Sequence, residues 1–274
     1  MTREEQDKLT EIARQIRIRI VKMLAQAGSG HPGGSLSMAE IMAYLYFKEM
    51  NIDPQNLQAA NRDRFVLSKG HAAPALYACL ALRNFFPESD LLTLRKVTSH
   101  LQGHPHRLGT PGVEASTGSL GQGLSMATGM AIGLRISGIQ ARVFCVVGDG
   151  ESQEGQIWEA AMSAGFRKLS NLCVFLDYND LQIDGRVSAI KDIRPIKEKW
   201  EAFRWHVREI DGHNLLEIAD AVERFKAETE KPTMIIAHTV KGKGVSFMED
   251  QVDFHGVAPT REEEQVALKE LNHA

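Results

Sequence analysis

The chain has few of the features that mark secreted, membrane or nucleic-acid-binding proteins. Its 274 residues include only three cysteines, Cys79, Cys145 and Cys173, which lie in apolar runs without CxxC spacing. Buried free thiols in a reducing compartment fit this pattern better than a disulfide framework or a zinc site. Because the formal net charge is only −3, neither nucleic acid nor an anionic membrane is an expected partner.

Long hydrophobic runs are also missing from the sequence. No apolar stretch approaches the length of a membrane-spanning helix, and the charged N-terminus, MTREEQDKL, lacks the apolar core of a signal peptide. A hydrophobic content of 43% and a charged content of 24% are ordinary for a globular protein. The composition therefore predicts a cytoplasmic globular protein with no membrane partner.

The pattern of apolar residues predicts strands that alternate with helices along the chain. A first helix is expected over residues 4–27, ended by Gly28, and Ser37 can cap a helix from Met38 to Glu49 after an irregular stretch at 29–37. Further strands are expected at 63–67, 143–147, 172–176, 205–210 and 233–238. Further helices are expected up to Leu82, at 88–97, at 124–136, between the strands at 143 and 172, around Trp200, at 215–226 and after Thr260.

This succession predicts an α/β fold: a doubly wound, mostly parallel sheet with helices on both faces, forming one domain over residues 1–274. In the helix 124–136, Gly129, Ala131 and Gly133 allow close approach of a neighbouring helix or sheet, although the two glycines lower the helix propensity. Thr260 and Glu263 have the spacing of a capping box, which predicts the start of the last helix.

Two predicted strand ends carry oxygen ligands. One apolar run stops at the sequence Gly148-Asp-Gly, and the next leads into a loop that contains Asn179. Parallel strands joined by a helix end at the same edge of the sheet, so Asp149 and Asn179 should lie side by side. A plain turn would explain an isolated Gly-Asp-Gly, but the helix and strand between the two residues favour ligands for a hard cation on a diphosphate. The nearby acids Asp177, Asp180 and Asp184 fit a solvated loop better.

Histidines give the second signal. Four of the ten, His31, His71, His104 and His255, lie in Gly- or Pro-rich loops that can converge on one rim of an α/β sheet. There they could bind phosphate and transfer protons near neutral pH. The other loops are weak signals alone: Gly118-Ser-Leu-Gly-Gln-Gly could be a tight turn, and Lys241-Gly-Lys-Gly a solvated basic loop. His238, at a strand end, fits either a site or a surface position. The remaining histidines, His100, His106, His206, His213 and His273, lack such contexts.

Taken in order along nearly the whole chain, these motifs resemble the transketolase family of thiamine-diphosphate (ThDP) enzymes. The matching segments are Ser29-Gly-His-Pro-Gly-Gly-Ser, Leu67-Ser-Lys-Gly-His-Ala, Gly103-His-Pro, Ser116-Thr-Gly-Ser-Leu-Gly-Gln-Gly, Gly148-Asp-Gly-Glu-Ser-Gln-Glu-Gly, the loop from Asn179 to Gly185, Thr239-Val-Lys-Gly-Lys-Gly and Phe254-His-Gly. Pyruvate-dehydrogenase-type α chains share the Asp and Asn pair but not the histidine loops. Deoxyxylulose-phosphate synthases differ at Ser68-Lys-Gly-His-Ala-Ala-Pro.

The resemblance implies a role for each matching position. The implied Mg²⁺ ligands are Asp149, Asn179 and the Leu181 carbonyl. The implied cofactor contacts are Gly150, His71, Lys241, Asn179 and His255, with Gly118, Ser119 and Leu120 holding the aminopyrimidine and thiazolium. The implied catalytic residues are His31, His104 and His255, which would face the reacting carbon and the donor hydroxyls.

The resemblance also implies an incomplete enzyme. In the family this domain is followed by a pyrimidine-binding domain, which carries the glutamate that activates the cofactor, and by a third domain; here the sequence stops at Ala274. The implied protein is the N-terminal subunit of a split transketolase, in a hetero-oligomer that contains a dimer of this chain and a C-terminal partner subunit.

The implied reaction is transfer of a two-carbon ketol unit between sugar phosphates, as in the pentose phosphate pathway, with ThDP and Mg²⁺. The alternatives are another ThDP reaction, of sulfo-sugar, formaldehyde or deoxyxylulose-phosphate type, and a non-catalytic cofactor-binding scaffold.

Overall fold

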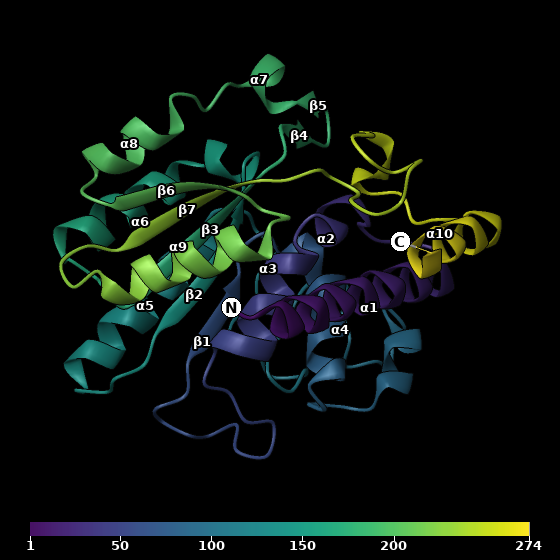
Figure 1. The fold of residues 1–274 in the computed structure, drawn as a ribbon, viewed down its shortest axis with the longest axis horizontal. Helices are drawn as coiled ribbons and strands as arrows, with labels where there is room; N and C mark the ends of the chain where they lie inside the picture. Colours follow the sequence, from purple (N-terminus) through teal and green to yellow (C-terminus); the bar gives the residue numbers. More distant parts are fainter. Residues whose placement is uncertain (274) are drawn as a thin grey trace.

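A five-stranded parallel sheet forms the centre of the chain (Figure 1). The computed structural model describes residues 1–273. The strand order is β1-β2-β3-β7-β6, and each neighbouring pair is parallel. The strands are β1 (Arg64–Leu67), β2 (Val143–Gly148), β3 (Leu172–Tyr178), β6 (His206–Asp211) and β7 (Thr233–His238), and a separate hairpin pairs β4 (Leu181–Gln182) with β5 (Gly185–Arg186). The predicted α/β fold class is confirmed.

Helices cover both faces of the sheet because side chains along each strand alternate between two cores. In β2, Phe144 and Val146 join the core of one face, whereas Val143, Cys145 and Val147 join the core of the other. The helices of the first face are α1 (Arg3–Ala27), α3 (Ala39–Tyr44), α4 (Ala73–Leu82) and α9 (Leu215–Ala227). Those of the second face are α5 (Gln122–Ile136), α6 (Gly155–Phe166) and α8 (Ile196–Ala202).

Shorter helices and the last helix complete the chain. The short α-helices are α2 (Gly33–Leu36) and α7 (Val187–Ile190), a π-helix spans Leu45–Glu49, and 3₁₀ turns span Gly70–Ala72, Glu88–Thr93, Glu151–Gln153 and Asp253–His255. The last helix, α10 (Arg261–His273), packs along α1, and Figure 1 shows the two lying together. Within residues 1–273, no helix has both the length and the apolar character needed to cross a bilayer.

Most predicted element ends agree with the structure within a few residues. Gly28 ends α1 in the left-handed conformation, with φ of 64°, and the Thr260–Glu263 capping box is present. The three cysteines are buried free thiols.

Two local predictions were wrong. The glycine-rich stretch 29–37 contains the helical turn α2, and Ser37 caps nothing, because its hydroxyl donates to Asp177 instead. The helix expected at 88–97 is a 3₁₀ turn that ends at Thr93. The close approach that small residues of α5 allow is used at Ala131, which faces the sheet; Gly129 and Gly133 lie on the outer face, and no atom of residues 1–273 lies within 4 Å of their Cβ positions.

Candidate functional site

The carboxyl ends of β2 and β3 bring Asp149 and Asn179 together. Gly148 pairs with Asp177 in the sheet, so the loops after both strands begin at the same level. Asp149 Oδ2 accepts hydrogen bonds from the backbone N–H groups of Asn179 at 2.9 Å and Asp180 at 2.6 Å. The two residues thus lie side by side, as expected for neighbouring parallel strands.

The donor atoms at this edge suit a hard cation. Asp149 is 3% exposed, and burial together with the nearby Asp177 carboxylate raises its pKa to about 6. The Asn179 side-chain oxygen and the Leu181 carbonyl supply two further oxygen atoms, while the Lys241 ammonium donates to that carbonyl at 2.8 Å. Mg²⁺ prefers such ligands and shares them with substrate phosphates. Within residues 1–273, no three His, Cys, Asp or Glu side chains cluster as a metal site.

A cavity of about 320 Å³ opens at this edge. Every residue predicted for the site lines it except His104 and Ser119, which lie just outside. Its walls come from the loops that follow α1, β1, β2, β3 and β7 and from the turn before α5, a convergence typical of ligand sites in open α/β sheets. Leu120, 37% exposed, lies on its rim.

The four loop histidines meet in this region. The ring centroid of His31 lies 5.3 Å from that of His71, 5.8 Å from that of His255 and 6.4 Å from that of His104. Burial, supported by nearby cations, lowers the pKa of His31 to about 4 and that of His255 to about 3. These imidazoles are therefore neutral at physiological pH. His238 lies elsewhere, paired with Glu209 at 3.2 Å on the surface.

Buried neutral imidazoles can exchange protons with a ligand. The Nδ1 atoms of His31 and His255 are buried and have no hydrogen-bond partner among residues 1–273. Buried polar atoms without a partner are rare and call for a ligand or water. The arrangement therefore places histidine nitrogens that can form hydrogen bonds next to the edge of the sheet whose oxygen atoms suit a cation and its phosphate.

Comparisons with known proteins agree with this geometry. Residues 8–272 match the family model described as "Transketolase, thiamine diphosphate binding domain". The chain belongs to the transketolase family. It is 47% identical to a 6-deoxy-6-sulfo-D-fructose transketolase subunit from Clostridium sp. (strain MSTE9) over 98% of both chains. It is 41% identical to an apulose-4-phosphate transketolase subunit from Actinobacillus succinogenes, over 97% of this chain and 96% of that one.

A solved structure supports the same assignment. Transketolase from Campylobacter jejuni superposes with a TM-score of 0.91 at 35% identity, over 96% of this chain but only 42% of that one. The chain thus spans about two fifths of that transketolase, yet nearly all of the relatives named as subunits. These comparisons confirm the predicted family and its ThDP-binding domain. They also confirm the likeness to split transketolase subunits.

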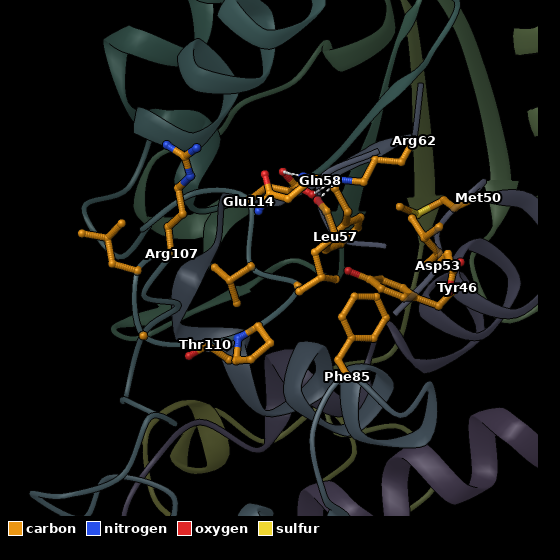
Figure 2. A pocket seen from close by; sticks show the side chains of 17 residues that line it. Tyr46, Met50, Asp53, Leu57, Gln58, Arg62, Phe85, Arg107, Thr110 and Glu114 are labelled. Carbon is orange, nitrogen blue, oxygen red and sulfur yellow. Dashed lines mark hydrogen bonds and ion pairs between the residues drawn. The ribbon is translucent and has the colours of Figure 1, made fainter. Parts of the chain in front are cut away.

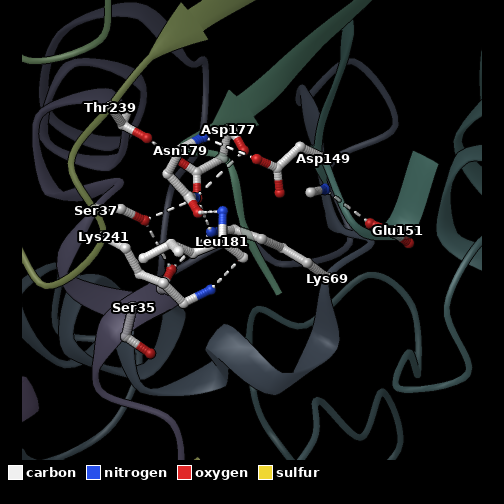
Figure 3. A network of polar contacts seen from close by, with 12 residues as sticks. Ser35, Ser37, Lys69, Asp149, Glu151, Asp177, Asn179, Leu181, Thr239 and Lys241 are labelled. Atoms are coloured by element: carbon white, nitrogen blue, oxygen red, sulfur yellow. Dashed lines mark hydrogen bonds and ion pairs between the residues drawn. The ribbon is translucent and has the colours of Figure 1, made fainter. Parts of the chain in front are cut away.

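Sequence reasoning missed the buried charges beneath this transketolase site (Figure 3). Asp177, expected in a solvated loop, is 1% exposed at the end of β3. It accepts hydrogen bonds from Lys69 at 2.5 Å, Ser37 at 2.8 Å and Thr239 at 2.5 Å. Although burial opposes ionisation, Lys69 and these hydrogen bonds keep the pKa of Asp177 below its usual value. The one residue in the sequence that could have indicated a buried partner for Asp177 was Lys69, in the motif Ser68-Lys-Gly-His.

Glu151 was also missed, and it joins two loops of the site. Its carboxylate accepts from the backbone N–H groups of Gly121 at 2.9 Å and Gly148 at 3.0 Å, and from the Ser68 hydroxyl at 2.5 Å. It therefore fixes the start of α5 against the end of β2. Its position directly after Gly148-Asp-Gly was the only signal in the sequence.

A second hollow of about 290 Å³ lies at the opposite, amino end of β1 (Figure 2). Tyr46 and Phe65 form one wall, and Arg62, paired with Glu114, forms another. Because the segment 107–114 also lines it and connects His104 with Gly118, this ion pair anchors the loop that carries both site residues.

Proposed function

We propose that this chain is the diphosphate-binding subunit of a split transketolase. With a separately encoded partner, it transfers a two-carbon ketol unit from a ketose phosphate to an aldose phosphate. The observation that carries the proposal is the convergence of four histidines with Asp149, Asn179 and the Leu181 carbonyl around one cavity, in a chain as long as relatives named as transketolase subunits. Residues 1–274 act as a single domain.

In this proposal the metal and diphosphate are held at the strand edge. Asp149, Asn179 and the Leu181 carbonyl bind Mg²⁺, which neutralises the buried carboxylate. His71, Gly150 and Lys241 contact the diphosphate; Lys241 Nζ, now on the Leu181 carbonyl, can donate to a phosphate oxygen. Gly118, Ser119 and Leu120 lie against the cofactor rings, where the absence of a side chain at Gly118 leaves room for the His104 ring.

The histidines handle protons and hydroxyls. ThDP, when bound, supplies the nucleophilic carbon and the electron sink for cleavage of the carbon–carbon bond. His31 and His255, neutral at physiological pH, accept and return the protons of the substrate hydroxyls through their free nitrogens. His104, more exposed than either, orients the donor, and His255 also contacts the cofactor.

The partner subunit, in this proposal, covers the outer face of α5 and α6. This face exposes Ile136 by 83%, Phe166 by 74% and Met162 by 55%, and Gly129 and Gly133 leave room beside it. Both helices begin at loops of the cavity and carry these apolar residues toward their other ends, so a chain that covers the whole length of both helices also reaches the site. The partner would supply what the longer transketolases carry beyond this domain, and the complex would contain two copies of this chain.

A sulfo-sugar donor is the second candidate. It is favoured by the 47% identity to the subunit named for 6-deoxy-6-sulfo-D-fructose, and it would place the reaction outside the pentose phosphate pathway. A scaffold without catalysis is the remaining alternative.

The test is reconstitution with the purified partner, ThDP and Mg²⁺. Xylulose 5-phosphate, apulose 4-phosphate and 6-deoxy-6-sulfo-D-fructose are offered as donors with a set of aldose phosphate acceptors, and two-carbon transfer is followed by mass spectrometry. The donor with the highest kcat/KM identifies the reaction. Cofactor binding without transfer from any donor would instead support the scaffold.

A further inference from the structure

A buried ion pair and one histidine support the segment that carries Lys241. Arg17 of α1 and Glu40 of α3 form two parallel hydrogen bonds of 2.7 Å each, and the two residues are only 7% and 9% exposed. His213, in the turn between β6 and α9, places its Nδ1 atom 3.0 Å from the same carboxylate. Although burial opposes ionisation, Arg17 and His213 lower the pKa of Glu40 to about 2. These three side chains form a polar triad.

The other ring nitrogen of His213 contacts the backbone. The N–H of Val240, which directly precedes Lys241, donates to His213 Nε2 at 2.8 Å. A ring nitrogen that accepts a hydrogen bond carries no proton, so the proton of the neutral imidazole lies on Nδ1 and is donated to Glu40. The ion pair thus fixes the tautomer of His213, and this tautomer allows the bond from Val240.

The segment beyond Lys241 is also held by neighbouring elements. The N–H of Gly242, whose φ of 81° is left-handed, donates to the Gly33 carbonyl at 3.0 Å. A Cβ atom at Gly244 would lie 3.0 Å from Arg17 Cδ. The segment therefore touches the polar triad near both of its ends, although no member of the triad lines the cavity.

We propose that His213 is a positioning residue for the cofactor's diphosphate: through Val240 it holds the Lys241 ammonium where it meets the phosphate. This inference rests on the proposed function, which assigns Lys241 to the diphosphate. Lys241 is 3% exposed and its Nζ donates to the Leu181 carbonyl at 2.8 Å, so its charge has a single place in the site. Groups that bind a ligand need supporting hydrogen bonds of this kind. If His213 served the fold alone, its loss would lower stability without weakening the contact of Lys241.

Two substitutions separate the two hydrogen bonds of His213. The amide of His213→Gln reaches as far as Nε2 and can accept from the Val240 N–H, whereas that of His213→Asn reaches only as far as Nδ1 and Glu40. Calorimetric titration of the full-length chain with Mg²⁺-pyrophosphate should show binding weaker by about ten-fold or more in the Asn variant and by less than about three-fold in the Gln variant. Equal affinities of the two variants would overturn the inference.

Lys241→Met shows whether the effect passes through the ammonium. In that background His213→Asn should weaken pyrophosphate binding by less than about two-fold further, because the contact that His213 positions is already gone. Losses that multiply would overturn the inference, since His213 would then act elsewhere.

Gly165→Ala is the control for lost stability, because a Cβ there would overlap the Phe203 carbonyl oxygen at the end of α6 remote from the cavity. This variant should bind pyrophosphate as the unaltered chain does. A loss equal to that of His213→Asn would mean that lower stability suffices, and the positioning role would be wrong.

NMR of the unaltered chain tests the same bond without any substitution, and it decides if His213→Asn fails to fold. The imidazole nitrogen shifts of His213 should report a protonated Nδ1 and an unprotonated Nε2, with a scalar coupling between Nε2 and the Val240 amide nitrogen. A proton on Nε2 at neutral pH would contradict the inference, because the Val240 N–H could not then donate to it.

Kinetics of the reconstituted complex separate this inference from the proposed function. His213→Asn should raise the ThDP concentration that gives the half-maximal rate about ten-fold or more, and leave kcat at saturating ThDP within about two-fold, because the histidines of the cavity are untouched. A lower kcat with an unchanged ThDP requirement would overturn the inference. The expected pyrophosphate results, together with no ketol transfer by the unaltered complex, would refute the proposed function alone.

Discussion

At the residue scale, Asp149 gives the cofactor-free chain a pH dependence of known sign. Its pKa is raised from 3.8 to about 6, so protonation is favoured in the folded state. Burial of the ionised Asp149 carboxylate therefore destabilises the folded chain. This destabilisation is absent below pH 3.8 and complete above about pH 6. Relative to Asp149→Asn, the unaltered chain should therefore be about 1.4 kcal/mol more stable at pH 5 than at pH 7.5. Urea unfolding of both proteins at the two pH values measures this difference.

The same pair of proteins tests the metal assignment. Mg²⁺-ThDP should raise the thermal midpoint of the unaltered chain at pH 7.5, because a ligand that binds only the folded state stabilises it. The Asn variant should show little or no rise, whereas Asp184→Asn, in the loop beyond the cavity, should respond normally. Equal stabilisation of Asp149→Asn would contradict the role of this carboxylate.

The Lys69–Asp177 pair should contribute strongly to stability because it is buried. Lys69→Met leaves the Asp177 charge without its partner, which costs roughly 3–5 kcal/mol. Adding Asp177→Asn removes that charge, so the double variant should be more stable than Lys69→Met alone. Chemical denaturation of the single and double variants gives the coupling energy, and strictly additive losses would mean that the two side chains do not interact.

The sequence was sufficient to predict that the polar residues at two strand ends lie side by side, but not the charges beneath them. Asp149 and Asn179 could be placed together because parallel strands end at one edge, a rule that needs no side-chain detail. The burial of Asp177 and Glu151 could not be predicted, because it depends on partners far along the chain, such as Lys69. The role proposed for His104 comes from the resemblance to transketolases, because spacing alone gave it none.

At the element scale, two helical glycines should respond to alanine in opposite directions. Gly165 in α6 packs against Phe203, and a Cβ there would overlap the Phe203 carbonyl oxygen. Gly165→Ala should therefore destabilise the chain by about 1–3 kcal/mol. Gly133 in α5 has no atom within 4 Å of its Cβ position, so Gly133→Ala should stabilise the isolated chain by up to about 1 kcal/mol. Thermal unfolding of both variants tests this, and shifts of the same sign would contradict it.

Element predictions succeeded where local and tertiary preferences agreed. The strand β2 and the helix α1 have clear periodicity and clear ends, so both were predicted within a few residues. The turn α2 was missed because Gly33 and Gly34 have low helix propensity. Tertiary contacts hold it, since a Cβ at Gly33 would press on Lys241 and one at Gly34 on the His71 ring.

At the scale of the whole molecule, the outer face of α5 and α6 exposes large apolar side chains that an isolated chain would be expected to bury. Glycines in the helix 124–136 were expected to allow a neighbouring element to approach, and no atom of residues 1–273 lies within 4 Å of the Cβ positions of Gly129 and Gly133. An expectation based on the sequence alone could not tell an internal neighbour from an external one. A partner subunit on this face would satisfy it.

Phe166→Glu should therefore weaken association with the partner while leaving the chain folded. A charge within an apolar interface loses its hydration, which reduces affinity by about ten-fold or more. Leu216→Glu is the matched control, because Leu216 is also exposed, at 48%, but lies on α9 over the opposite face of the sheet. Sedimentation velocity with the purified partner measures both affinities, and circular dichroism checks the fold. If Leu216→Glu loses affinity for the partner and Phe166→Glu does not, the partner binds the other face of the sheet. That result would contradict the proposal that the partner covers α5 and α6 and reaches the cavity from there.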